Sequence, residues 1–337
     1  MQLFTTCVEQ LDLAAIQLHQ NNSAYRRFAL ILIDNVVELL AHNHCKKVLQ
    51  DNCYTRILPP RYPKAIRDDV LGRDFSKKMK FLHGLGLVSA IDLIFILKAH
   101  GYRNESYHTG IVHDDIIHAI GWHYHGIACE LFVPLKPTES MSLIDPPSAV
   151  VQKHVASGGL PFSEDYLRKS AKSLLRARPS PEPNLAETLA TSALKRIQTI
   201  EDTLAYVVKN HPDRFDEEKT IREVQFWSDV FENEPEGGYI LPAMSTQWKE
   251  RLLFMSTEWR PKIKKCPFNR WKERANCIST EENYANAIQN FENISRDLSY
   301  FEHVVSSACS RFDAYVDEQI NIMREKRTCD PETSPTG

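Results

Sequence analysis

The sequence predicts an all-α protein that contains a helical bundle and a second helical domain. Apolar residues recur at spacings of three and four through most of the chain. The alternating pattern of a strand is nearly absent, and Pro, Gly or Asn marks the breaks between apolar stretches. At 337 residues the chain exceeds what one small core requires, so we expect two domains.

The N-terminal domain is expected to cover residues 1–133 as an up-and-down, four-helix type of bundle. Residues 3–19 and 24–49 have helical apolar spacing, and Asn22 lies between them as capping material. The segment 51–72 carries three prolines and several basic and aromatic residues, which favours a loop. Another helix is expected from Arg73. The apolar run 87–100 predicts a buried helix that ends at Gly101, and a last helix follows Gly110.

The second half of the chain also has helical patterns, after a segment rich in Pro, Gly and Ser. Residues 134–161 are therefore expected to form a linker or crossover, and residues 162–325 a C-terminal helical domain. We expect Asn184 to cap one of its helices. The tail, 326–337, is predicted to be disordered. We find no internal repeat, P-loop or GxGxxG motif.

Charge and cysteine usage exclude several classes of protein. Residues 1–136 hold 15 Lys and Arg against 13 Asp and Glu, and the remainder holds 26 against 31, so neither half has the basic balance of a dedicated duplex-DNA binder. The eight cysteines have no CxxC spacing, which favours reduced thiols and a cytoplasmic location. Charged residues interrupt the most apolar runs, so we expect no membrane span.

The stretch most suggestive of chemistry is KAHGYRNESYHTG, residues 98–110, between two apolar helical segments. It contains Arg103, Asn104 and His108. Arginine offers a permanently charged fork for phosphate oxygens, and histidine moves protons near neutral pH without a metal. This inventory suits attack by an RNA 2′-hydroxyl on the adjacent phosphate, with Arg103 stabilising the developing charge.

The pattern R-N-E-S-Y-H-x-G resembles the signature of the HEPN superfamily of helical nucleotide-binding bundles, in which Arg and a polar residue precede His. Arg103, Asn104 and His108 match it, and ALILIDNVVELL (29–40) looks like an early helix of such domains. The resemblance covers residues 1 to about 133. It implies a homodimer with two Arg/His pairs facing one cleft, and a metal-independent endoribonuclease, often a toxin or anti-phage defence effector with an antitoxin or defence partner protein. A non-catalytic HEPN-like module that binds nucleotide, RNA or a protein is the alternative, and a structural scaffold is a third possibility.

Helical geometry constrains how Arg103 and His108 act together. Each residue of an α-helix advances about 100°, so these two would lie about 140° apart on a regular helix. We therefore expect either a non-helical turn at Arg103 or a site completed by two chains.

Basic residues on two segments are predicted to contact RNA, because charges can follow phosphates while aromatic rings stack on bases. They are Arg73, Lys77 and Lys80 in the first domain, and Arg260, Lys264, Lys265, Arg270 and Lys272 in WRPKIKKCPFNRWKER. A solvated loop fixed by core tryptophans is an equal alternative for the second segment.

Two acidic residues four apart, Asp34 and Glu38, favour a solvated helix face, with a supporting role beside the 98–110 stretch as the alternative. No metal or cofactor is predicted. The histidines at 113, 118, 123 and 125 do not bring three side chains to one helical face, and HExxH is absent.

Overall fold

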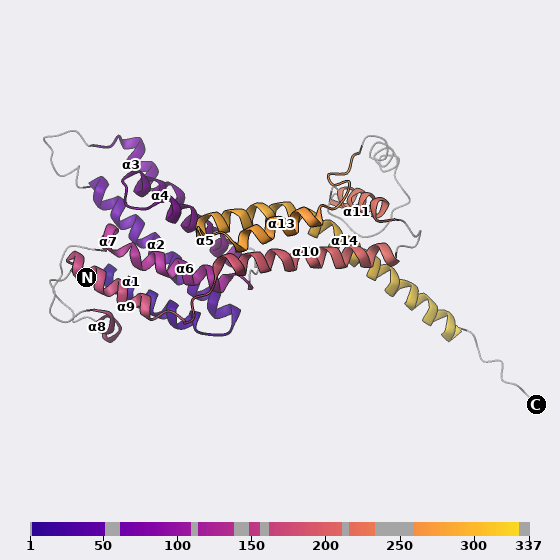
Figure 1. The fold of residues 1–337 in the computed structure, drawn as a ribbon, viewed down its shortest axis with the longest axis horizontal. Helices are drawn as coiled ribbons and strands as arrows, with labels where there is room; N and C mark the ends of the chain where they lie inside the picture. Colours follow the sequence, from indigo (N-terminus) through magenta and orange to yellow (C-terminus); the bar gives the residue numbers. More distant parts are fainter. Residues whose placement is uncertain are drawn as a thin grey trace, which may run out of the picture. The chain divides into compact units, whose positions relative to one another are not determined.

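The structure of the chain is a computed structural model (Figure 1). It describes residues 2–50, 61–108, 114–137, 148–155, 162–210, 216–232 and 259–329. Every regular element among them is a helix, which confirms the predicted all-α class. The helices are α1 (Gln2–Leu18), α2 (Ser23–Gln50), α3 (Lys64–Leu71), α4 (Phe75–Gly84), α5 (Ala90–His108), α6 (Ile117–Glu130), α7 (Phe132–Leu135), α8 (Ala149–His154), α9 (Glu164–Arg176), α10 (Leu185–Asn210), α11 (Glu217–Glu232), α13 (Phe268–Ser279) and α14 (Tyr284–Cys329).

Two compact units make up the chain, and their limits differ from the predicted domains. The first unit comprises residues 1–192 and 278–291, and the second comprises 193–277 and 292–337. The expected boundary at 134–161 is therefore not where the chain divides. Helix α8 lies inside that stretch and packs against α1 and α9, with Val151 fully buried. Its apolar residues bind it to the first unit, which is why this part of the stretch is not a free linker.

Helix α2 is the central helix of the first unit. It packs against α1, α3, α4, α5, α6 and α7. Its buried residues recur at helical spacing and include Leu30, Ile33, Val37 and Leu40, so most of its circumference faces other helices. Any polar residue on its inner faces must therefore find a partner inside the bundle.

Local signals account for several of the helix ends. The side chain of Asn22 accepts a hydrogen bond from Ala24 N (2.8 Å), and that of Asn184 accepts one from Glu187 N (3.1 Å), which confirms both as caps. Asp74 caps α4 by accepting from Lys77 N at 3.2 Å. After α4, Gly86 has φ +74°, a left-handed conformation that glycine adopts without strain.

The second unit has its own core. Val207 of α10, Val224 of α11, and Val304 and Ala308 of α14 form a buried cluster. Arg196 of α10 makes a bidentate ion pair with Glu302 of α14, at 2.7 and 2.8 Å, and its Nη1 also donates to Ser295 Oγ. Helices α10 and α14 contribute residues to both units.

Three further expectations need correction or lie outside the described residues. Helix α5 does not end at Gly101 but continues to His108, and α14 continues through residues 326–329 of the predicted disordered tail. The predicted loop at 51–72 is wrong over its second half, where Lys64–Leu71 form α3. Residues 1, 51–60, 109–113, 138–147, 156–161, 211–215, 233–258 and 330–337 are outside the described part of the chain, including the end of the 98–110 stretch. Among the described residues, no helix is both long and apolar enough to cross a membrane.

Candidate functional site

The candidate site is a cluster of polar side chains inside the first unit, formed by Asp34, Glu38, His100, Arg103 and Tyr124. We call it the Asp34 cluster. Asp34 and Glu38 come from α2, His100 and Arg103 from α5, and Tyr124 from α6. The expectation that Asp34 and Glu38 lie on a solvated face is wrong for Asp34, which is fully buried. The alternative, a supporting role beside the 98–110 stretch, fits its contacts.

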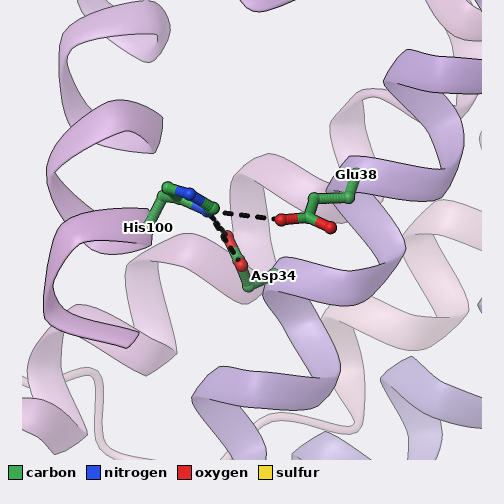
Figure 2. Close-up of side chains that lie close together, drawn as sticks. All are labelled: Asp34, Glu38 and His100. Atoms are coloured by element: carbon green, nitrogen blue, oxygen red, sulfur yellow. Dashed lines mark hydrogen bonds and ion pairs between the residues drawn. The ribbon is translucent and has the colours of Figure 1, made fainter. Parts of the chain in front are cut away.

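Asp34 is the hub of this cluster. Tyr124 donates its hydroxyl proton to Oδ1 over 2.9 Å. The Nδ1 atom of His100 lies 3.0 Å from Oδ2 and 3.2 Å from Oδ1 (Figure 2). The Nε atom of Arg103 lies 3.4 Å from Oδ2. A buried carboxylate is costly unless charged and hydrogen-bonded partners compensate it, and these three residues supply that compensation from two other helices.

The hydrogen bonds assign the tautomer of His100. An ionised carboxylate can only accept hydrogen bonds, so the proton lies on Nδ1 and points to Asp34. Glu38 Oε1 is 3.5 Å from the same nitrogen, and the side chains of Asp34, Glu38 and His100 converge from two helices (Figure 2). The ring of Phe75 packs against the imidazole with centroids 4.5 Å apart. The imidazole is therefore fixed on two sides.

Burial and charge shift two ionisable groups of the cluster. Burial, and then the negative charge of Asp34, raise the pKa of Tyr124 well above its ordinary value, so this residue stays a hydroxyl donor. Burial and then Asp34 also raise the pKa of Glu38, against the opposing effect of His100 and Arg103. The cluster thus combines a permanent cation with an oriented imidazole beside carboxylates.

Asp34, Glu38 and His100 offer ligand atoms within 4.8 Å of one another, which is close enough for a metal ion. Two features oppose that use. Tyr124, His100 and Arg103 already engage both oxygens of Asp34. The Arg103 guanidinium also places a positive charge beside Asp34, which disfavours a cation bound to the same carboxylate. The arrangement is better explained as a charge-balanced hydrogen-bond network.

The predicted catalytic residues all lie on the last turns of α5. Arg103 Nη1 donates to Asn104 Oδ1 over 2.8 Å, so Asn104 helps to orient the guanidinium. His108 is the last residue of the helix. The non-helical turn expected at Arg103 is wrong, because Gly101 does not adopt the positive φ of a helix cap and the helix continues through it. Arg103 and His108 therefore lie about 140° apart around one helix.

The predicted RNA-binding residues of the first unit are all exposed. Lys77 and Lys80 are three apart on α4, and Arg73 precedes its cap. Lys77 forms an ion pair with Asp69, and both side chains are about half exposed. Pairs of this kind contribute little to stability and can reopen for another anion.

The basic segment of the second unit differs from the prediction of a stacking surface. Arg260, Lys264, Lys265 and Arg270 are exposed, but Lys272 pairs with Glu201 at 2.6 Å. Trp271 is buried, and Trp259 donates its indole proton to Asp229 over 2.8 Å. These two tryptophans are used inside the unit, which favours the alternative of a solvated segment fixed by core aromatics.

Sequence reasoning missed His100 and Tyr124. A signal was available for the cluster, since Asp34 interrupts the apolar run ALILIDNVVELL on a helix that is otherwise buried. His100 is three residues before Arg103, a spacing that puts both on one side of a helix. The six cysteines whose side chains the structure describes form no disulfide.

Comparison with known proteins adds no relative: no protein-family model, curated protein or solved structure matches the chain.

Proposed function

We propose that this protein is a metal-independent endoribonuclease with a HEPN-like N-terminal domain. The observation that carries the proposal is the anchoring of Arg103, which is held by buried Asp34 and by Asn104 on the same helix that carries His108. A cation fixed before substrate binds can stabilise charge that develops in the transition state without reorganising. Arg103 is the phosphate clamp, His108 transfers a proton, and Asn104 orients the clamp.

The reaction needs two copies of the chain. Positions 103 and 108 are about 140° apart around an α-helix, which favours a site that two copies share. A homodimer in which Arg103 of one copy and His108 of the other face one cleft provides such a site. Arg73, Lys77 and Lys80 are candidates for contacts with the RNA backbone outside the cleft. The role as a toxin or anti-phage effector, with an antitoxin or defence partner, rests on the motif resemblance alone.

Cleavage of RNA in excess EDTA tests the proposal. The purified chain should leave 2′,3′-cyclic phosphate ends, since the 2′-hydroxyl is the nucleophile. His108→Ala should abolish cleavage while its melting temperature matches that of the wild type. A requirement for a divalent metal, or full activity in the His108→Ala variant, would show that the proposal is wrong.

One observation favours a second candidate, a HEPN-like module that binds nucleotide or RNA, or docks a protein, without cutting RNA. The guanidinium of Arg103 is engaged by Asp34 and Asn104, so part of its charge is compensated inside the bundle. In this case Arg103→Ala weakens binding of a labelled RNA, but no RNA is cut at any protein concentration. Toxicity on expression that His108→Ala relieves would decide for the nuclease.

A further inference from the structure

The Asp34–His100 pair leaves one imidazole nitrogen available for chemistry. Nδ1 is directed at Asp34, at 3.0 and 3.2 Å. In the part of the chain that the structure describes, Nε2 of His100 makes no hydrogen bond, and the side chain is 20% exposed. An imidazole whose inner nitrogen is fixed by a buried carboxylate, and whose outer nitrogen is open, is arranged to exchange a proton with a substrate.

The orientation of this imidazole is set in advance by its surroundings. Tyr124 fixes the Asp34 carboxylate through Oδ1, and Phe75 packs against the imidazole ring. Asp34 itself is fully buried, so water does not compete for it. A proton-transfer group held in this way loses little entropy when it reaches the transition state.

Arg103 places a phosphate-binding group directly beside His100. The two residues are three apart on α5, about 60° around the helix axis, and both contact Oδ2 of Asp34. A phosphate bound to the Arg103 guanidinium therefore lies within reach of the His100 ring. Position 108 is about 140° from position 103 around the same helix axis.

We propose that His100 is a second catalytic residue, the general acid of the reaction, a role that rests on the proposed ribonuclease function. His108 of the second copy takes the proton of the 2′-hydroxyl while O2′ forms a bond to phosphorus. The bond between phosphorus and O5′ breaks, and Nε2 of the imidazolium of His100 gives its proton to O5′. Asp34 stabilises that imidazolium, as the carboxylate of a catalytic triad does. The products are a 2′,3′-cyclic phosphate and a free 5′-hydroxyl, and no electron is gained or lost.

The test compares two substrates that differ in one atom. One is an RNA oligonucleotide, and the other has sulfur in place of O5′ at a single linkage. A thiolate leaves without a proton, so the second substrate does not need a general acid. We expect His100→Ala to cut the ordinary RNA on the order of 10²–10⁴-fold more slowly and to cut the sulfur-containing RNA at nearly the wild-type rate.

Two further variants guard against loss of folding and unspecific effects. His100→Asn keeps an N–H donor near the Nδ1 position and so keeps the bond to Asp34, but it has no second nitrogen to donate a proton. It should melt like the wild type and show the same substrate dependence as His100→Ala. His42→Ala, which removes an exposed histidine of α2, is the matched control and should cut both substrates normally.

Each outcome separates this inference from the proposed function. If the wild type cuts no RNA, both are wrong. If the wild type cuts RNA and His108→Ala does not, but His100→Asn cuts ordinary RNA at the normal rate, only the role of His100 is wrong. Equal slowing of His100→Asn on both substrates also overturns the general-acid role, because a positioning defect does not depend on the leaving atom.

Discussion

Among the described residues of the first unit, two Asp–His pairs with a buried aspartate differ in what surrounds the histidine. In the pair Asp12–His154, both ring nitrogens are occupied: Nε2 lies 2.6 Å from Asp12 Oδ1, and Nδ1 lies 3.0 Å from Ser173 Oγ. The His154 side chain is only 1% exposed. In the pair Asp34–His100 a single ring nitrogen is occupied, the ring is 20% exposed, and a guanidinium lies beside it.

The Asp12–His154 pair serves as a latch for helix α8. This helix has six residues, too few to be stable without tertiary contacts. Lys153 and His154 at its end bind Asp12 of α1, and Ser148 at its start donates to Glu9 over 2.6 Å. An Asp–His pair alone therefore does not make a site. An open nitrogen and a neighbouring cation distinguish the candidate site from the latch.

The largest expected difference between the pairs concerns catalysis. His100→Asn should slow RNA cleavage on the order of 10²–10⁴-fold, because it removes a proton-transfer group. His154→Gln should leave the cleavage rate per folded molecule unchanged and lower the melting temperature. Both rates are measured well below the melting temperatures, with the folded fraction checked by circular dichroism. If His154→Gln slowed cleavage more than His100→Asn, the proton-transfer role proposed for His100 would be wrong.

Stability should also separate the two aspartates. Asp34→Ala leaves the Tyr124 hydroxyl and Nδ1 of His100 without their acceptor and removes the ion-pair partner of Arg103, so we expect a loss of about 3–5 kcal/mol in the free energy of unfolding. Asp12→Ala should cost about 1–3 kcal/mol, because Lys153, with a side chain 60% exposed, regains water. Urea unfolding measures both values. Equal losses in the two variants would mean that burying Asp34 and burying Asp12 leave their partners equally dependent on them.

Acid should weaken the latch in a predictable direction. Burial alone would raise the pKa of Asp12, but hydrogen bonds from Lys153 and His154 outweigh it and hold the pKa below its ordinary value of 3.8. The unfolded chain therefore binds this proton more readily than the folded one. The stabilisation is complete above pH 3.8 and is lost as the pH falls through the lowered pKa. Urea unfolding over a pH series should show this loss of stability in the wild type and not in Asp12→Asn. If the free energy of unfolding depended on pH in the same way in both proteins, Asp12 would not stabilise the fold through this ion pair.

The smallest effect is expected at Glu38. Its pKa is raised by burial and by Asp34, so the charged form is disfavoured in the folded state. Stability from this group is therefore greatest below its ordinary pKa of 4.5 and falls as the pH rises through the raised pKa. Glu38→Gln should melt slightly higher than the wild type near neutral pH and equally in acid. A lower melting temperature at neutral pH would show that Glu38 stabilises the cluster through His100.

Much of the fold was predictable because local patterns decide it. The limits of α1 and α2 follow the apolar spacing and the Asn22 cap to within a residue or two. The end of α5 was not predictable, because a glycine such as Gly101 can end a helix but can also lie inside one. The limits of the first unit were unpredictable for another reason: the latch joins α8 to Asp12, more than 130 residues earlier in the sequence.

The candidate site was predictable only in part. Arg103, Asn104 and His108 follow from a local motif, but their helical setting does not. Asp34 and Glu38 have the i, i+4 spacing of an exposed charged face, and only the packing of α5 and α6 on α2 shows that Asp34 faces inward. His100 and Tyr124 are 66 and 90 residues from Asp34. Contacts over such separations depend on tertiary packing, which a single sequence does not display.

Mixing two inactive variants tests the central claim most directly, namely that Arg103 of one copy and His108 of another form the site. Arg103→Ala and His108→Ala should each fail to cut RNA in EDTA. In a heterodimer of the two, one of the two composite sites keeps both residues, so mixed protein should regain up to about half of the wild-type activity per heterodimer. No recovery in a mixture shown to contain heterodimers, or activity of either variant alone, would contradict the account.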